Sequence, residues 1–184
     1  MRIRRGNFAA AVLAVLAITG CAQTAKRTLP DGIRTIYIRE FTNKTDQMAL
    51  SAILLEEIRR EFRLDGRLTV LDSSQGADSE LDGKAVEYAR QPARFDRNNV
   101  VQEYRLRLII DCSLRDVAKG ETLFQEKGPE SSATPGASTR KLERYTNYVV
   151  VPASGMMAET EQDAQRRIAR DLARDLVLKV IEGW

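Results

Sequence analysis

A group of basic side chains on and beside two predicted loops is the set of residues best suited to chemistry in this sequence. Its members are Arg90, Arg94, Arg97, Arg140, Lys141 and Arg144. Guanidinium and ammonium groups bind anionic phosphates, and an arginine does so through two parallel hydrogen bonds. An ordinary solvated loop surface explains the same residues equally well, because Asp96, Glu130 and Glu143 dilute the positive charge.

Catalytic and metal-binding side chains are scarce. The sequence contains no histidine and two cysteines, Cys21 and Cys112. This excludes Ser-His-Asp and Cys-His nucleophiles, histidine general bases and histidine metal ligands, and two cysteines build no zinc site or disulfide framework. Aspartate or glutamate catalysis stays open, but no carboxylate pair or glycine-rich phosphate loop is recognisable. We therefore predict a protein that is not an enzyme and has no metal or cofactor.

Cys21 has the surroundings of a lipid attachment site. Residues 1–20 carry arginines at positions 2, 4 and 5, then an apolar run over Phe8–Ile18, as in a secretory signal peptide. A buried core helix or a short anchor is the alternative, but the run is shorter than the ~20 residues that cross a bilayer core. Ile18-Thr19-Gly20-Cys21 resembles the bacterial lipobox, which implies an acylated Cys21. Ala22, in place of an aspartate, favours the outer membrane.

The charge balance argues against a nucleic-acid-binding protein. The formal charge is +3, from 29 Lys and Arg against 26 Asp and Glu, and the three arginines of the signal peptide account for all of it. A neutral mature chain lacks the basic surface that binds nucleic acid. Its length suits one domain. We expect a signal peptide over 1–20, a lipidated N-terminus and tether over 21–30, and one domain over 31–184.

Two amphipathic helices are expected. The first runs over about Gln47–Leu64, after possible N-cap residues at 43–46, and Gly66 ends it. Its apolar stripe repeats every four residues, at Leu50, Leu54, Ile58 and Phe62. The second runs over Glu161–Glu182, with a capping box formed by Thr160 and Asp163.

Strands account for most of the remaining chain. They are expected over 35–41, 67–72, 81–90, 104–115 and 121–127, and part of a long loop over 128–159, residues 145–151, could extend the last one. Apolar and polar residues alternate most clearly over 104–115, where only Ile109 breaks the pattern and Cys112 lies on the core face. The order β-α-β-β-β-β-α predicts an α+β two-layer sandwich, with both helices on one face of a mixed four- to five-stranded sheet.

The strand order also predicts where the basic residues lie. Following the meander upward from Leu81 places a turn over Gln91–Asn99 and the long loop over 128–159 at the same end of the sheet. Arg94, Arg97, Arg140, Lys141 and Arg144 would then share that end, with Arg90 just below them. The tether is expected at the opposite end.

Several segments in the same order resemble one family. After the lipobox come Thr35-Ile-Tyr-Ile-Arg-Glu-Phe-Thr-Asn-Lys-Thr, Glu61-Phe-Arg-Leu-Asp-Gly-Arg-Leu and Gly76-Ala-Asp-Ser-Glu-Leu-Asp-Gly. Arg97-Asn-Asn-Val-Val-Gln-Glu-Tyr-Arg-Leu and Asp171-Leu-Ala-Arg-Asp-Leu-Val follow. Together they resemble LptE, the outer-membrane lipopolysaccharide-assembly lipoproteins, over most of the mature chain.

The resemblance implies a partner and a function. Members of this family plug LptD, the β-barrel lipopolysaccharide translocon of the outer membrane, support its assembly and are thought to bind lipopolysaccharide. Only Arg97 matches a family motif for lipopolysaccharide contact, because Ala158-Glu159-Thr160 stands where a further basic residue would be expected. The polar alternating positions Arg105, Arg107, Asp111 and Arg115 would face the polar lumen of such a barrel.

A different class of envelope lipoprotein is the alternative. Activators of peptidoglycan synthases and subunits of secretion pores share a similar β-α-β-β beginning. Whether a large β-barrel, a penicillin-binding protein or a self-assembled ring accompanies the purified protein would discriminate between the two readings.

Overall fold

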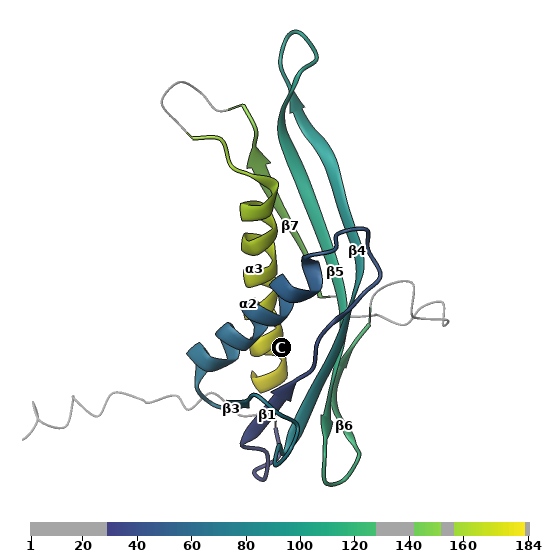
Figure 1. Cartoon of the computed structure of the whole chain (residues 1–184), viewed down its shortest axis with the longest axis vertical. Coiled ribbons are helices and arrows are strands. Elements are labelled where there is room, and N and C mark those ends of the chain that lie inside the picture. Colours follow the sequence, from purple (N-terminus) through teal and green to yellow (C-terminus); the bar gives the residue numbers. More distant parts are fainter. Residues whose placement is uncertain (1–28, 128–141, 152–156, 183–184) are drawn as a thin grey trace, which may run out of the picture.

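The computed structural model describes residues 29–127, 142–151 and 157–182. Two helices lie on one face of a long, twisted mixed sheet (Figure 1). This confirms the predicted α+β two-layer sandwich. The described sheet has seven strands rather than four to five, because the sequence pattern missed the short β2 (Thr42–Asn43) and gave no separate strand to β7 (Leu142–Val149).

The sheet is built around one long hairpin. Strand β4 (Ser79–Phe95) pairs antiparallel with β5 (Val101–Asp116) along nearly its whole length. On the other side of β4, β1 (Thr35–Ile38) and β2 pair in parallel, and β3 (Thr69–Leu71) pairs in parallel with β1. On the other side of β5, β6 (Thr122–Glu126) pairs with its lower part and β7 with its upper part, both antiparallel.

The core lies between the inner face of the sheet and the two helices. Helix α2 (Leu50–Asp65) buries the predicted stripe of Leu50, Leu54, Ile58 and Phe62 completely. Helix α3 spans Glu161–Glu182, the predicted bounds, and buries its own stripe from Ala164 to Val180. On the sheet, Leu106, Leu108, Ile110, Cys112 and Leu114 all belong to this core, as their alternation predicts.

The ends of the helices follow local hydrogen bonding. Gly66 has a φ of +72° and its N–H donates to Phe62 O, so it ends α2 as predicted. The predicted start at Gln47 is wrong by one turn, because Asn43 and Thr45 use their side chains to hold the turn before the helix. In α3 the Asp163 N–H donates to Thr160 Oγ1 at 3.2 Å, which is the capping bond expected.

The predicted turn over Gln91–Asn99 is too long. Strand β4 continues through Pro92, which lies opposite Tyr104, and the turn contains only residues 96–100. Proline weakens a strand pairing because it has no N–H, and the register of β4 shifts on either side of Arg94. The strand tolerates this because its other edge has no strand neighbour beyond Ala85 among the described residues.

Gly83 lets an aromatic ring approach the inner face of β4. Phe41 is 2% exposed, and a Cβ atom placed on Gly83 would lie 2.1 Å from Phe41 Cε1. Real Cβ atoms do not approach that closely, so a larger residue must push the ring out of the core. Packing and not backbone conformation requires glycine at this position, because the φ of Gly83 lies outside the left-handed region.

Asp78 joins β1 to the beginning of β4. Its Oδ2 accepts hydrogen bonds from Arg34 N, Thr35 N and Thr35 Oγ1, at 2.9, 2.8 and 2.9 Å. The Asp78 N–H in turn donates to Thr35 Oγ1. The backbone N–H of Arg34, followed by the Thr35 hydroxyl, holds the pKa of this carboxyl below its ordinary value.

Replacing Gly83 by alanine should destabilise the fold. We expect Gly83→Ala to lower the free energy of unfolding by about 1–3 kcal/mol, because the new methyl group displaces the Phe41 ring. Urea unfolding of the full chain measures this. Gly32→Ala is the matched control, since its Cβ would meet no atom within 4 Å. An equal effect of the two substitutions would contradict the packing argument.

The Asp78 bonds should make stability depend on pH. A carboxyl with a lowered folded-state pKa stabilises the fold above its ordinary value of 3.8 and stops doing so as the pH falls through the lowered value. We expect Asp78→Ala to be clearly less stable than the parent at pH 7, with the gap closing below about pH 4. Asp31→Ala, at an exposed aspartate, serves as the control. A gap independent of pH would refute this role.

Candidate functional site

The tip of the β4–β5 hairpin presents a guanidinium group to solvent. Asp96 Oδ1 accepts the N–H groups of Asn98 and Val100 at 2.7 and 2.9 Å, and Asn99 adopts a φ of +60°. Asparagine tolerates this left-handed conformation better than most residues. Arg97 stands between these two anchors, is exposed, and has no acidic partner in the described part of the chain.

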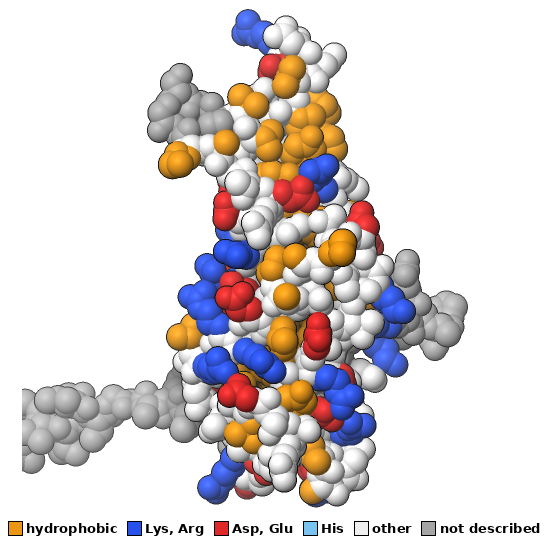
Figure 2. Space-filling view, viewed as in Figure 1, with side chains coloured by type: hydrophobic (Ala, Val, Ile, Leu, Met, Phe, Trp, Pro, Cys, Tyr) orange, Lys and Arg blue, Asp and Glu red, His pale blue; other side chains and the backbone are white. Residues whose placement is uncertain are grey.

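Hydrophobic side chains flank this turn. Phe95 and Val100 are each about half exposed, at 53% and 50%. Figure 2 shows hydrophobic side chains gathered over the upper part of the hairpin, where it extends beyond α3. The tip therefore presents an exposed guanidinium group next to apolar surface. An amphipathic anion has a charged group to bind the first and an apolar part to contact the second.

Arg94 and Arg90 lie below the tip, and both already have partners. Arg94 Nε lies 3.2 Å from Glu103 Oε2 across the hairpin. Arg90 Nη1 donates to Glu161 Oε2 at 2.5 Å, and its guanidinium lies 5.0 Å from the centre of the Tyr104 ring. Arg94 belongs to the strand and not to the turn, and Arg90, expected just below the tip, lies opposite Leu106 and well down the hairpin.

Arg144 is not at the tip, which corrects the expected grouping. Strand β7 runs antiparallel to β5 and starts with Leu142 opposite Ile110, so Arg144 lies opposite Leu108 near the middle of the sheet. There it forms an ion pair with Asp175 of α3. Strand β6 ends with Glu126 opposite Cys112 and β7 begins with Leu142 opposite Ile110, so these two ends lie at a similar height on β5. Arg140 and Lys141 lie outside the described residues, as does Cys21.

The outward face of the sheet is ionic and largely neutralises itself. Glu80 lies between Arg39 and Arg115, at 2.5 and 2.9 Å, and the hydrogen bond from Arg39 is the main cause of its lowered pKa. Further up, Arg107 pairs with Glu87 and Glu143 at 2.7 and 2.6 Å. This confirms the predicted polar alternation of β5 and adds cross-strand partners that alternation alone does not reveal.

Ile109 and Asp111 lie on the outward face of β5 but are buried. Ile109 is fully buried although it lies on the outward side, opposite Glu87 and Glu143. Asp111 is 6% exposed and lies 3.0 Å from Lys84 Nζ. Asp111 and Lys84 therefore balance each other's charge in the middle of this face.

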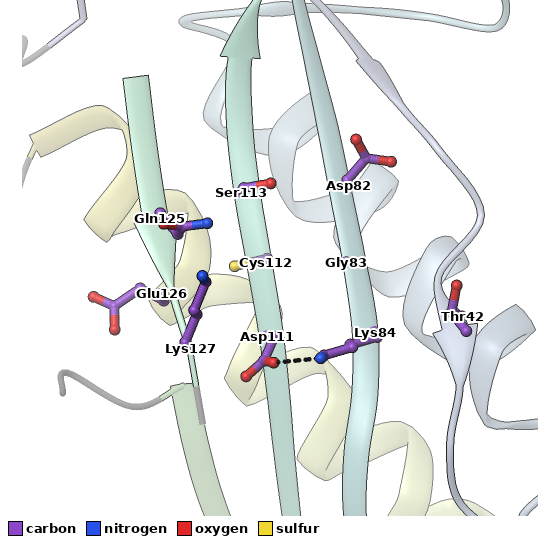
Figure 3. Close-up of a pocket in the computed structure, with 10 residues that line it drawn as sticks. All are labelled: Thr42, Asp82, Gly83, Lys84, Asp111, Cys112, Ser113, Gln125, Glu126 and Lys127. Carbon is purple, nitrogen blue, oxygen red and sulfur yellow. Dashed lines mark ion pairs between the residues drawn. The ribbon is translucent and has the colours of Figure 1, made fainter. Parts of the chain in front are cut away.

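A depression of about 350 Å³ lies on β2, β4, β5 and β6 (Figure 3). Lys84 points across the strands toward Asp111, and Lys127, Gln125 and Ser113 line the same hollow. Cys112 reaches its wall but is buried, and burial raises the pKa of its thiol, so the predicted small buried hydrophobe is confirmed.

A second pocket lies at the beginning of α3. It measures about 310 Å³ and is lined by Asp46, Gln47, Tyr88, Arg90 and Glu161. Tyr88 Oη donates to Glu161 Oε1 at 2.9 Å. Only Arg90 of this set was singled out from the sequence. The others come from three separate regions of the chain, so no local spacing could reveal them.

The described residues hold no metal-binding constellation and no helix suited to crossing a bilayer. Over 29–127, 142–151 and 157–182, no three cysteine, aspartate or glutamate side chains gather as metal ligands. Within the same ranges, neither helix is long and apolar enough to span a membrane.

Solved structures with similar folds include lipoproteins from several bacteria. Rare lipoprotein B of Shewanella oneidensis is 11% identical, with a TM-score of 0.40 and coverage of 80% of this chain and 90% of that one. A minor lipoprotein of Acinetobacter baumannii is 14% identical, with a TM-score of 0.43 and coverage of 80% and 90%. The PelC dodecamer of Paraburkholderia phytofirmans is 12% identical, with a TM-score of 0.45 and coverage of 79% and 86%. These scores are too low to carry a functional argument.

The family match is more specific than these structural likenesses. No curated protein matches the sequence significantly. The family model LptE, described as lipopolysaccharide assembly, matches residues 33–180, which include every strand and nearly all of both helices. LptE is a family of non-enzymatic envelope lipoproteins. Because the match spans most of the sequence, the chain belongs to the LptE family of lipopolysaccharide-assembly lipoproteins.

Proposed function

We propose that this protein plugs the β-barrel lipopolysaccharide translocon LptD, supports its assembly and helps to deliver lipopolysaccharide to the outer leaflet. The observation that carries this proposal is the family match over residues 33–180. The protein acts by binding and not by catalysis. Its partners are LptD, lipopolysaccharide and the outer membrane, and nucleic acid is not among them.

The outward face of the sheet suits the inside of a barrel. A barrel lumen is polar, so a plug needs a polar surface that does not carry a large unpaired charge. The Glu80 and Arg107 ion pairs meet both conditions, because every charge in them has a partner on a neighbouring strand or segment. Such a face can be desolvated in part without leaving a bare charge.

The two ends of the sheet suit different tasks. Strand β1 pairs with the start of β4, so the described chain begins at the end of the sheet opposite to Arg97. We infer that the acylated Cys21 and a tether over 21–30, left after removal of the signal peptide over 1–20, hold this lower end at the periplasmic rim. The domain over 31–184 then extends its hairpin tip toward the outside.

Arg97 is the first candidate for lipopolysaccharide contact. It is exposed on a turn that Asp96 and Asn99 hold in shape, so binding a phosphate costs little ordering of the backbone. Arg94 and Arg90 lie below it, and each would have to share its acidic partner with the ligand. Arg144 is paired with Asp175 in the middle of the sheet and is the weaker candidate, while Arg140 and Lys141 stay candidates from the sequence alone.

Purification from membranes tests the proposed partner. When the native lipoprotein is solubilised from the outer membrane, LptD should accompany it, and depletion of the lipoprotein should lower surface lipopolysaccharide. Mass spectrometry of the purified complex identifies the barrel. Recovery of a penicillin-binding protein or a self-assembled ring, with normal lipopolysaccharide export after depletion, would favour the alternative class of envelope lipoprotein.

Arg97→Ala should weaken binding of lipopolysaccharide by about five- to tenfold, because one charge-assisted contact to phosphate is lost. Titration of the full chain in detergent with lipopolysaccharide measures the change. Lys119→Ala is the matched control, since Lys119 is an exposed cation on the turn between β5 and β6 at the other end of the sheet. If both variants bind equally well, the hairpin tip is not the phosphate contact.

A further inference from the structure

We propose that the polar pocket at the beginning of α3 binds a saccharide ring. The identity of the ligand as the sugar portion of a glycolipid rests on the proposed function, but the chemistry of the pocket does not. The pocket lies on the inner side of the hairpin, below the tip that carries Arg97. One glycolipid could therefore meet a phosphate contact at the tip and a sugar contact below it.

The pocket is formed by side chains from three regions. The segment before α2 contributes Asp46 and Gln47, β4 contributes Tyr88 and Arg90, and the first turn of α3 contributes Glu161. Its volume of about 310 Å³ lies at the lower end of the range for small-molecule sites, about 300–1,000 Å³. This space suits a ligand of one or two rings.

The lining selects hydroxyl groups over the other parts of a glycolipid. Each side chain that lines the pocket ends in a group that forms hydrogen bonds, so an acyl chain would leave these groups without partners. Arg90 is already bound to Glu161 at 2.5 Å, and Asp46 adds a second carboxylate, so an anionic phosphate meets no net positive charge. A sugar hydroxyl both donates and accepts, and it can use guanidinium, amide, phenol and carboxylate groups together.

Two stacked aromatic rings position the Arg90 side chain at the pocket. The rings of Tyr104 and Tyr148 stack with centroids 5.6 Å apart, and the Arg90 guanidinium lies over the Tyr104 ring. The pKa of Arg90 is raised, first by its hydrogen bond to the Tyr148 hydroxyl and then by Glu161. Tyr148 is only 3% exposed, so these rings hold the Arg90 guanidinium at the edge of the pocket and leave hydrogen bonds as the contacts to a sugar.

The pocket side chains are held in place before any ligand arrives. Gln165, which is 7% exposed, donates from Nε2 to Gln47 Oε1 at 3.1 Å and to Tyr88 Oη at 3.2 Å. Tyr88 is held in addition by Glu161. A ligand therefore pays little entropy to order these groups, which is the condition for useful affinity from a few hydrogen bonds.

Calorimetric titration of the full chain in detergent tests the proposal, with the lipid-free core oligosaccharide of lipopolysaccharide as the probe. The parent protein should bind it, and Tyr88→Phe and Gln47→Leu should each weaken binding about fivefold by removing one hydrogen-bonding group. Both substitutions conserve side-chain size, and a single cooperative unfolding transition above the titration temperature confirms that each variant folds, although each loses a hydrogen bond to Gln165. Gln125→Leu, on the outward face, is the matched control and should bind like the parent.

Three results would overturn the sugar pocket. The first is no oligosaccharide binding by a protein that still binds intact lipopolysaccharide, which would leave the proposed function standing. The second is equal binding by Tyr88→Phe, Gln47→Leu and Gln125→Leu. The third is displacement of the oligosaccharide by inorganic phosphate, which would identify an anion site. Oligosaccharide binding that is lost in Tyr88→Phe, without binding of lipopolysaccharide or LptD, would refute the proposed function and support the pocket.

Discussion

The alternation of apolar and polar residues along β5 is the constraint on which the rest of the structure depends. Successive side chains of a strand point to opposite faces, so a register slip of one residue would turn Arg105 and Arg107 into the core. Strand β5 pairs on both sides along most of its length, with β4 on one side and with β6 and β7 on the other. Its register therefore decides which face the helices cover and which face carries ions.

The two faces are stabilised by different forces that depend on each other. Burial of the apolar face against α2 and α3 supplies the driving force, at about 25 cal/mol for each Å² removed from water. The ionic face supplies little net stability, since exposed ion pairs are worth about 0–1 kcal/mol each. The ion pairs of this face instead favour the observed strand order, because Glu80 and Arg107 each pair with residues on two neighbouring strands or segments. A plug needs this division, since its outer surface must be able to lose water without unfolding the core.

The sequence predicts local features well and long-range ones poorly. The bounds of α3 follow from a capping bond at Thr160 and an apolar stripe, both of which are local in sequence. Pro92 led to a wrong placement of the turn. The strand tolerates this proline because the far edge of β4 has no strand neighbour there among the described residues, and that depends on tertiary structure. Arg144 was misplaced for a similar reason, since the pairing of Leu142 with Ile110 spans 32 residues of chain. The pocket at α3 was invisible for the same reason, because Gln47, Tyr88 and Glu161 come together only after the sheet and the helices have packed.

The length of the hairpin explains why binding chemistry gathers at one end. Strands β4 and β5 continue beyond the first turn of α3, so no helix covers the sheet there, and aromatic and polar side chains meet solvent. At the opposite end Asp78 joins β4 to Arg34 and Thr35 through four hydrogen bonds, which fix the start of β1 against β4. This arrangement places Arg97 at the end of the sheet far from the point of attachment, and the α3 pocket between the two ends. Binding groups at the anchored end would lie beside the tether. Because the two ends of the sheet differ, one small domain can be anchored to the membrane at one end and contact a ligand away from that end.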